Sequence, residues 1–174
     1  GKVKKKRIAI IGDVMLDTFE YGKVTRMSPE APVPVILIND IISMPGGAGN
    51  VALNIKHLGG EPVLITTVGN DAESITLKNI FKKEKMSVSG IFTEKVKPTI
   101  TKKRVLVDGK HFARVDKEST DKSSKKVEVE IINFFKKNVS KFDCVILSDY
   151  VKGLMTKKTI ENRERTLINN SSLI

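Results

Sequence analysis

The stretch Ser43-Met44-Pro45-Gly46-Gly47-Ala48-Gly49-Asn50-Val51-Ala52-Leu53-Asn54 decides the fold. A proline and two glycines precede apolar residues at three- and four-residue steps, which predicts an amphipathic helix from about Ala48 to Leu58. The helix N-terminus offers free N–H groups and the positive end of the helix dipole, and the glycines let a ligand approach the backbone closely. This end of the helix suits a hydroxyl-rich or anionic ligand, although most glycine pairs are only turns.

Three short apolar runs have the pattern of buried parallel strands. They are residues 6–11, 62–68 and 142–147. Predicted helices at 72–85 and 127–137 alternate with them, which indicates an α/β fold with a mainly parallel sheet. Two further β-rich segments do not fit this alternation and are expected to form a small separate sheet. They are residues 33–38 and 99–115, the second a hairpin with an Asp-Gly turn.

Carboxylates follow the predicted strands at the point where each strand ends. Asp13 and Asp17 follow the first strand, Asp71 the second and Asp149 the third. Because the carboxyl ends of parallel strands meet at one edge of a sheet, these side chains are expected to converge near the glycine pair. Carboxylates accept hydrogen bonds from neighbouring hydroxyls, and Asn50 both donates and accepts. The set favours a sugar site over a metal site, which would include His or Cys.

Composition limits the classes of function. The 174 residues carry a net charge of +11, but the lysines are scattered and there is no Trp, so a solvated basic surface or a phosphorylated ligand fits better than a nucleic acid. The sequence contains no apolar run long enough for a membrane span. A single cysteine, Cys144, excludes an internal disulfide and favours the cytoplasm. It is expected to be a small core residue of its strand.

Five blocks of sequence together resemble the ribokinase-like (PfkB) carbohydrate kinases. Within that superfamily they are most similar to the kinase domain of the bifunctional heptose-7-phosphate kinases/ADP-heptose synthases. The resemblance covers about residues 6–158, and the second and fifth blocks are specific to that subgroup. The blocks are Ile-Gly-Asp-Val-Met-Leu-Asp (11–17), Ser-Pro-Glu-Ala-Pro-Val-Pro-Val (28–35), Pro-Gly-Gly-Ala-Gly-Asn-Val-Ala (45–52), Pro-Thr-Ile-Thr-Lys-Lys-Arg-Val (98–105) and Leu-Ser-Asp-Tyr-Val-Lys-Gly (147–153).

The resemblance implies a ribokinase-like kinase part over residues 1–160, with a β lid formed by segments near 17–45 and 98–116. It implies phosphoryl transfer from ATP, with Mg²⁺, to C1 of D-glycero-β-D-manno-heptose 7-phosphate, a step toward the ADP-heptose of lipopolysaccharide. It also implies a homodimer formed through the lid. The residues expected to bind substrate are Asp13, Asp17, Gly46, Gly47 and Asn50 at the sugar hydroxyls, Lys102 and Arg104 on the lid facing the sugar or its phosphate, and Asp149 and Lys152 at the floor.

The sequence departs from the family in one respect. The family's Gly-Ala-Gly-Asp motif, which carries the catalytic base and the anion hole, does not occur in it. The C-terminal half of the kinase fold is therefore expected to be missing, with no catalytic residue, no metal ligand and no bound ATP in this chain alone. Residues 161–174 form an atypical polar tail, expected to be disordered or frame-altered.

Three other functions stay open. The first is another PfkB-type sugar or nucleoside kinase, which the two subgroup-specific blocks disfavour. The second is a catalytically inactive sugar-phosphate-binding or dimerisation module. The third is a basic nucleic-acid-binding domain, which the scattered charge disfavours.

Overall fold

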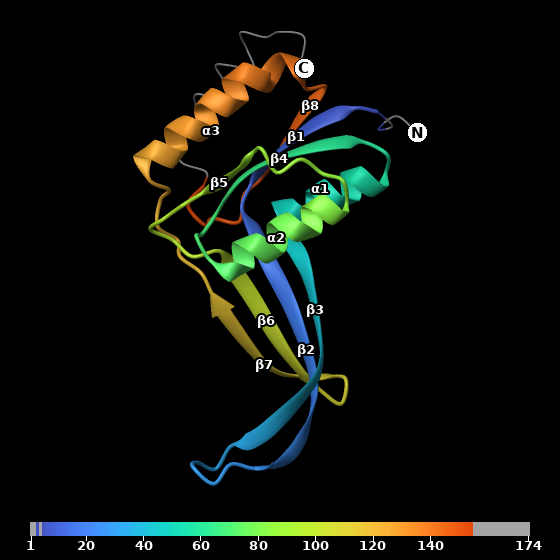
Figure 1. The fold of residues 1–174 in the computed structure, drawn as a ribbon, viewed down its shortest axis with the longest axis vertical. Coiled ribbons are helices and arrows are strands. Elements are labelled where there is room, and N and C mark those ends of the chain that lie inside the picture. Colours follow the sequence, from blue (N-terminus) through green and yellow to red (C-terminus); the bar gives the residue numbers. More distant parts are fainter. Residues whose placement is uncertain (1–2, 4, 155–174) are drawn as a thin grey trace.

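The computed structural model describes residue 3 and residues 5–154, which form a helix-covered sheet and a second sheet that extends from it (Figure 1). The first sheet has the strand order β5-β4-β1-β8, and all neighbouring pairs in it are parallel. Its strands are β1 (Arg7–Gly12), β4 (Glu61–Val68), β5 (Ile91–Thr93) and β8 (Cys144–Ser148). The parallel sheet expected from the apolar runs is thereby confirmed.

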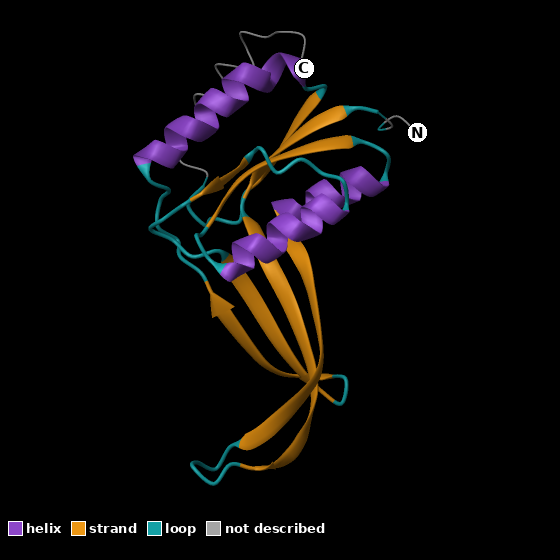
Figure 2. Ribbon diagram, in the orientation of Figure 1, coloured by secondary structure: helices purple, strands orange, loops and turns teal. Residues whose placement is uncertain are grey.

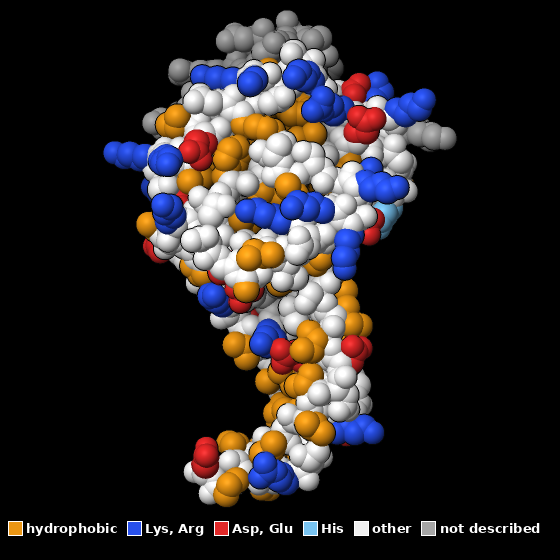
Figure 3. Space-filling view, viewed as in Figure 1, with side chains coloured by type: hydrophobic (Ala, Val, Ile, Leu, Met, Phe, Trp, Pro, Cys, Tyr) orange, Lys and Arg blue, Asp and Glu red, His pale blue; other side chains and the backbone are white. Residues whose placement is uncertain are grey.

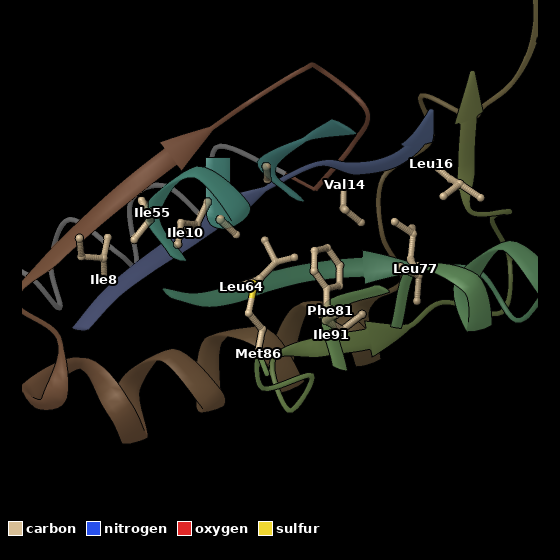
Figure 4. Packing of buried hydrophobic residues seen from close by; sticks show 13 residues of the cluster. Ile8, Ile10, Val14, Leu16, Ile55, Leu64, Leu77, Phe81, Met86 and Ile91 are labelled. Atoms are coloured by element: carbon tan, nitrogen blue, oxygen red, sulfur yellow. The ribbon is translucent and has the colours of Figure 1, made fainter. Parts of the chain in front are cut away.

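Helices cover both faces of this sheet (Figure 2). On one face, α1 (Ala48–His57) and α2 (Ala72–Lys83) bury Ala52, Leu77 and Phe81 against alternate residues of β1 and β4 (Figure 4). On the other face, α3 (Lys125–Asn138) and the following 3₁₀ turn η1 (Val139–Lys141) pack against the intervening residues of the same strands. Strand residues therefore alternate between two apolar clusters, which is why the central strands are apolar on both faces.

The second sheet, called the lid sheet below, has the order β3-β2-β6-β7. Its strands are β2 (Val14–Met27), β3 (Pro34–Gly47), β6 (Ile100–Val107) and β7 (Lys110–Lys117). The two hairpins are antiparallel, but they meet through a parallel β2–β6 pair. The distal half of the β2–β3 hairpin projects beyond the β6–β7 turn (Figure 1). The separate sheet and the Asp108-Gly109 turn are as the sequence predicted.

Two expectations need correction. The sequence analysis assigned no strand before residue 33, and residues 21–34 are rich in turn formers, whereas β2 runs from Val14 to Met27 and accommodates Gly22 beside a register shift. Cys144 was expected in the core but is exposed. It faces the side of the sheet that carries α1 and α2, and these helices pack over β1 and β4 rather than over the edge strand β8. The predicted tail at 161–174 lies outside the described residues.

Asp71 joins the lid sheet to the parallel sheet. Its carboxylate caps α2 by accepting from the Ser74 N–H at 3.0 Å, and it also accepts from the Thr99 N–H at 2.8 Å and the Thr99 hydroxyl at 2.6 Å. Burial raises the pKa of the Asp71 carboxyl, but the hydrogen bonds from Thr99 and Ser74 outweigh it, so the net pKa is below the ordinary 3.8. The ionised form therefore fixes the start of β6.

Replacing Asp71 by Asn should lower the stability of the chain by about 1–3 kcal/mol at pH 7, because the charged acceptor of three hydrogen bonds is lost. Because the pKa of Asp71 is lower in the folded than in the unfolded state, its carboxylate stabilises the fold at pH values above the unfolded-state pKa. This stabilisation is lost as the pH falls through the folded-state pKa. The stability difference between wild type and variant should therefore shrink below about pH 4. Urea unfolding from pH 3 to 8 measures it. The control is Asp108→Asn, at a turn residue with φ +49° that Asn tolerates; an equal loss in both variants would contradict the prediction.

Candidate sugar-phosphate site

Asp13 anchors the site at the carboxyl end of β1. The residue is 4% exposed, and its Oδ2 accepts hydrogen bonds from the backbone N–H groups of Tyr150 at 3.0 Å and Lys152 at 3.1 Å. Its backbone oxygen accepts from the Ala48 N–H, the first of α1, at 2.9 Å. Asp13 therefore binds together the helix start and residues 149–153, called the β8 loop below. Both loop N–H groups bind Oδ2.

Gly46 and Asp17 lie side by side at the base of the lid sheet. A Cβ atom on Gly46 would lie 2.1 Å from Asp17 Oδ2, so only glycine fits at this position while Asp17 keeps its place. The Asp17 carboxylate accepts from Arg104 Nη1 at 2.7 Å, and the Arg104 guanidinium lies 5.1 Å from the centre of the Phe19 ring. The guanidinium stacked on Phe19 orients the Asp17 carboxylate, and the absence of a side chain on Gly46 leaves room for it.

Lys102 and Lys152 converge on one carboxylate although they come from different elements. Lys152 Nζ donates to Glu118 Oε1 at 2.8 Å, and Lys102 Nζ lies 3.6 Å from Glu118 Oε2. Lys102 Nζ is also 3.5 Å from Asp116 Oδ2. The hydrogen bond from Lys152, with the charges of Lys152 and Lys102, holds the pKa of Glu118 below its usual value despite some burial. Two lysines thus share the Glu118 carboxylate at the base of the lid, with Asp116 beside Lys102.

The remaining predicted residues lie around these groups. Gly47 takes φ +57° as the N-cap of α1, and a Cβ there would lie 2.4 Å from the Asp13 backbone oxygen. Asn50 is exposed in the first turn of α1. Asp149 is also exposed, and its Oδ1 accepts from the Val151 N–H at 2.8 Å within the β8 loop.

Sequence reasoning missed Lys97, which precedes β6. This lysine is 8% exposed, and its Nζ donates to the backbone oxygens of Asp121 at 2.7 Å and Lys152 at 3.1 Å. Burial lowers the pKa of the Lys97 ammonium, while the charges of Asp13, Glu94 and Asp121 act in the opposite direction. The one sequence signal for Lys97 is its position directly before the Pro98–Val105 block. The hydrophobic pattern gives no indication that this lysine is buried.

Two negative findings apply to residue 3 and residues 5–154. This part of the chain contains no group of three or more His, Cys, Asp or Glu side chains that could hold a metal ion. It also contains no helix long and apolar enough to cross a membrane.

Solved structures share the fold. The chain superposes on a putative phosphofructokinase from Staphylococcus aureus with a TM-score of 0.73 at 10% identity, covering 94% of this chain and 50% of that one. It superposes on the tetrameric inhibited form of phosphofructokinase-2 from Escherichia coli with a TM-score of 0.61 at 16% identity, covering 93% and 52%. These similarities show a ribokinase-like fold.

Curated relatives are closer in sequence. The chain is 42% identical over 156 residues to bifunctional protein HldE of Hyphomonas neptunium, covering 90% of this chain and 32% of that protein. It is 37% identical over 159 residues to bifunctional protein HldE of Aliarcobacter butzleri, covering 91% and 33%. The chain thus spans about a third of the length of these relatives. The model of the pfkB family carbohydrate kinases matches residues 5–171, and the chain belongs to this family.

Proposed function

We propose that the protein is the sugar-binding part of a cytoplasmic kinase that transfers the γ-phosphoryl group of ATP to C1 of D-glycero-β-D-manno-heptose 7-phosphate, toward ADP-heptose for lipopolysaccharide. The observation that carries the proposal is the convergence of Lys102 and Lys152 on Glu118, beside the Asp17–Arg104 pair. The 32–42% identity to bifunctional HldE proteins supports the choice of a heptose phosphate.

The charges suit a ligand that carries both hydroxyls and a phosphate. Carboxylates accept hydrogen bonds from sugar hydroxyls. The Asp17 carboxylate lies beside Gly46, which has no side chain to cover it from that direction. The proposed sugar ligands are Asp13, through Oδ1, together with Asp17, Gly46, Gly47, Asn50 and Asp149. A phosphate dianion is a stronger partner for the two ammonium groups than the single charge of Glu118. The proposed phosphate ligands are therefore Lys102 and Lys152, with Arg104 close by.

The chain itself supplies binding rather than transfer in this proposal. Phosphoryl transfer depends on a placed base, a metal ion and charge stabilisation around the phosphoryl group. The 174 residues contain no Gly-Ala-Gly-Asp motif, and the described residues contain no metal-ligating group. The same observations favour the second candidate, a sugar-phosphate-binding or dimerisation module without turnover. Phosphorylation of heptose 7-phosphate, measured for this chain and for the longest product of its gene, separates the two. Turnover by the longer product supports the kinase, and no turnover by either supports the module.

Replacing Lys102 by Met should weaken binding of heptose 7-phosphate about tenfold or more, because an ion pair to the phosphate is lost while the apolar stem remains. Isothermal titration calorimetry with the 174-residue chain measures the dissociation constant. Heptose without the phosphate should bind wild type and variant equally.

The matched control is Lys103→Met on the same strand. Neighbouring strand residues face opposite sides of the sheet, and Lys103 Nζ pairs with Glu20 at 2.9 Å rather than with the site. This variant should bind heptose 7-phosphate within about twofold of wild type. Equally weak binding of heptose 7-phosphate by both variants would contradict a specific phosphate site and would indicate only a general attraction between a basic protein and an anion.

Replacing Glu118 by Gln should strengthen binding of heptose 7-phosphate about three- to tenfold, because the neutral amide competes less with the phosphate for Lys102 and Lys152. The control is Glu30→Gln, at an exposed residue of the turn between β2 and β3. Weaker binding by Glu118→Gln would mean that Glu118 itself supports the ligand or orders the lysines, and would contradict competition.

The lid sheet is also the proposed dimer interface. Its strands expose large apolar residues on a sheet that no described helix covers beyond its base (Figure 3). Exposed apolar strands and open edges require a partner to remain soluble. The most exposed of these residues are Met27, Leu37, Ile41 and Val115. We infer a homodimer formed by two lid sheets.

A charge on this surface should therefore produce monomers. Leu37→Lys places an ammonium group in the proposed apolar interface, and it should raise the dimer dissociation constant at least about tenfold in sedimentation equilibrium. Asn39→Lys adds the same charge to an exposed position of the same strand without removing apolar area. A monomeric wild type, or a Leu37→Lys variant that stays dimeric, would refute the interface.

A further inference from the structure

Lys97 is a buried cation that the proposed substrate contacts do not use. Its ammonium group binds two backbone oxygens from two different loops, Asp121 O at 2.7 Å and Lys152 O at 3.1 Å. Lysine is almost never buried without partners, because removing its charge from water is unfavourable. Lys97 therefore occupies a site built for a cation.

The two loops meet directly at this ammonium group. The Ser123 N–H donates to Gly153 O at 3.2 Å, and Gly153 takes φ +87°. A Cβ on Gly153 would lie 2.0 Å from Asp121 O and 3.1 Å from Lys97 Nζ. Only glycine allows this approach, so the backbone at 121 and 153 closes around Lys97 without an intervening side chain.

The β8 loop is held between opposite charges. Asp13 accepts the N–H groups of Tyr150 and Lys152, and Lys97 binds the carbonyl oxygen of Lys152. Asp13, Lys97, Glu94 and Lys152 line one cavity of about 10 Å³, about the space of one water molecule. Lys152 thus donates its backbone N–H to the buried Asp13 carboxylate, and its carbonyl oxygen accepts from the buried Lys97 ammonium group.

This clamp holds a strained backbone. Val151, between the two clamped residues, takes φ +58°, a conformation that β-branched residues rarely adopt. Such a conformation is strained and persists only where the surrounding contacts determine it. Asp13 and Lys97 supply those contacts. The strain falls in the loop that presents Lys152 Nζ to Glu118.

Lys97 also balances acidic groups. Asp13, Glu94 and Asp121 carry the charges that act on its ammonium group. Glu94 is itself buried, and its carboxylate accepts from the N–H groups of Lys95, Val96 and Ser124. Without Lys97, buried Asp13 and Glu94 would lose their nearby cation, and the like charges would favour opening of the β8 loop.

We propose that Lys97 is a positioning residue for the sugar-phosphate site: it holds the carbonyl oxygen of Lys152 while Asp13 holds the N–H groups of the β8 loop, and so sets where Lys152 meets the phosphate. The proposal rests on the proposed function for its ligand, whereas the clamp itself is a property of this chain. Lys97 makes no contact with the substrate. Its effect reaches the substrate through the backbone of Lys152.

Hydrogen exchange on the 174-residue chain tests the clamp without any ligand. In Lys97→Met, the amides of Tyr150 and Lys152 should exchange at least about tenfold faster, while amides of β1 and β4 keep wild-type rates. Lys97→Arg should restore part of the protection because it keeps the charge. Lys95→Met, at an exposed neighbour, should change nothing. Unchanged loop exchange, or equal acceleration throughout β1 and β4, would overturn the proposal.

A second variant covers the case in which Lys97→Met does not fold. Gly153→Ala disturbs the same junction from the loop side, since its Cβ would meet Asp121 O. It should accelerate exchange at Tyr150 and Lys152 in the same way. Protection equal to wild type in Gly153→Ala would overturn the clamp.

The functional half of the test uses heptose 7-phosphate as the probe. Lys97→Met should weaken its binding about tenfold and Lys97→Arg less, whereas heptose without phosphate, which meets only Asp149 of the β8 loop, should lose less affinity than heptose 7-phosphate. If wild type does not bind heptose 7-phosphate, the proposed function fails while the exchange result still decides the clamp. If wild type binds and Lys97→Met loosens the loop without weakening binding, the positioning role is wrong.

Discussion

The buried carboxylate of Asp13 is the constraint on which the rest of the site depends. An ionised group at 4% exposure must have its charge balanced and its oxygens hydrogen-bonded. Asp13 meets this requirement with two N–H groups of the β8 loop and with Lys97 nearby. Those donors lie in the loop that follows the edge strand β8. The hydrogen bonds to Asp13 therefore hold this loop over the end of the parallel sheet.

The lid sheet owes its place to a different set of interactions. Its strands enter and leave next to the parallel sheet: β2 begins two residues after β1, β3 runs directly into α1, and β6 follows the Asp71–Thr99 bonds. All three connections are short, so the base of the lid is rigid. Farther out, where register shifts interrupt the β2–β3 pairing, neither sheet face is covered by a described helix. The site lies at the base, whereas exposed apolar residues run the length of the lid sheet, from Val115 in its four-stranded part to Leu37 and Met27 on the projecting part.

Much of the fold could be predicted from the sequence because its signals are local. Apolar runs with turns at their ends located β1 and β4, and the three- and four-residue steps after Gly47 located α1 to within one residue. The errors arose where tertiary contacts decide. The partner strands β3 and β6 keep β2 extended through Gly22, which a local pattern of turn formers obscured. Cys144 looked like a core residue because its strand is apolar, but burial there depends on which strand lies at the edge.

The site shows the same division between local and tertiary signals. Residue types and spacing placed Asp13, Asp17 and the glycines, because each follows a strand end or begins a helix. The partners of these residues could not be read from spacing. Arg104 lies 87 residues from the Asp17 that it binds, and Lys97 lies 55 residues from the carbonyl of Lys152. A lysine in a basic chain gives no sequence sign of burial. Only the closure of two loops around its ammonium group distinguishes Lys97 from the many solvated lysines, and that closure requires Gly153 and Asp13 at their positions in space.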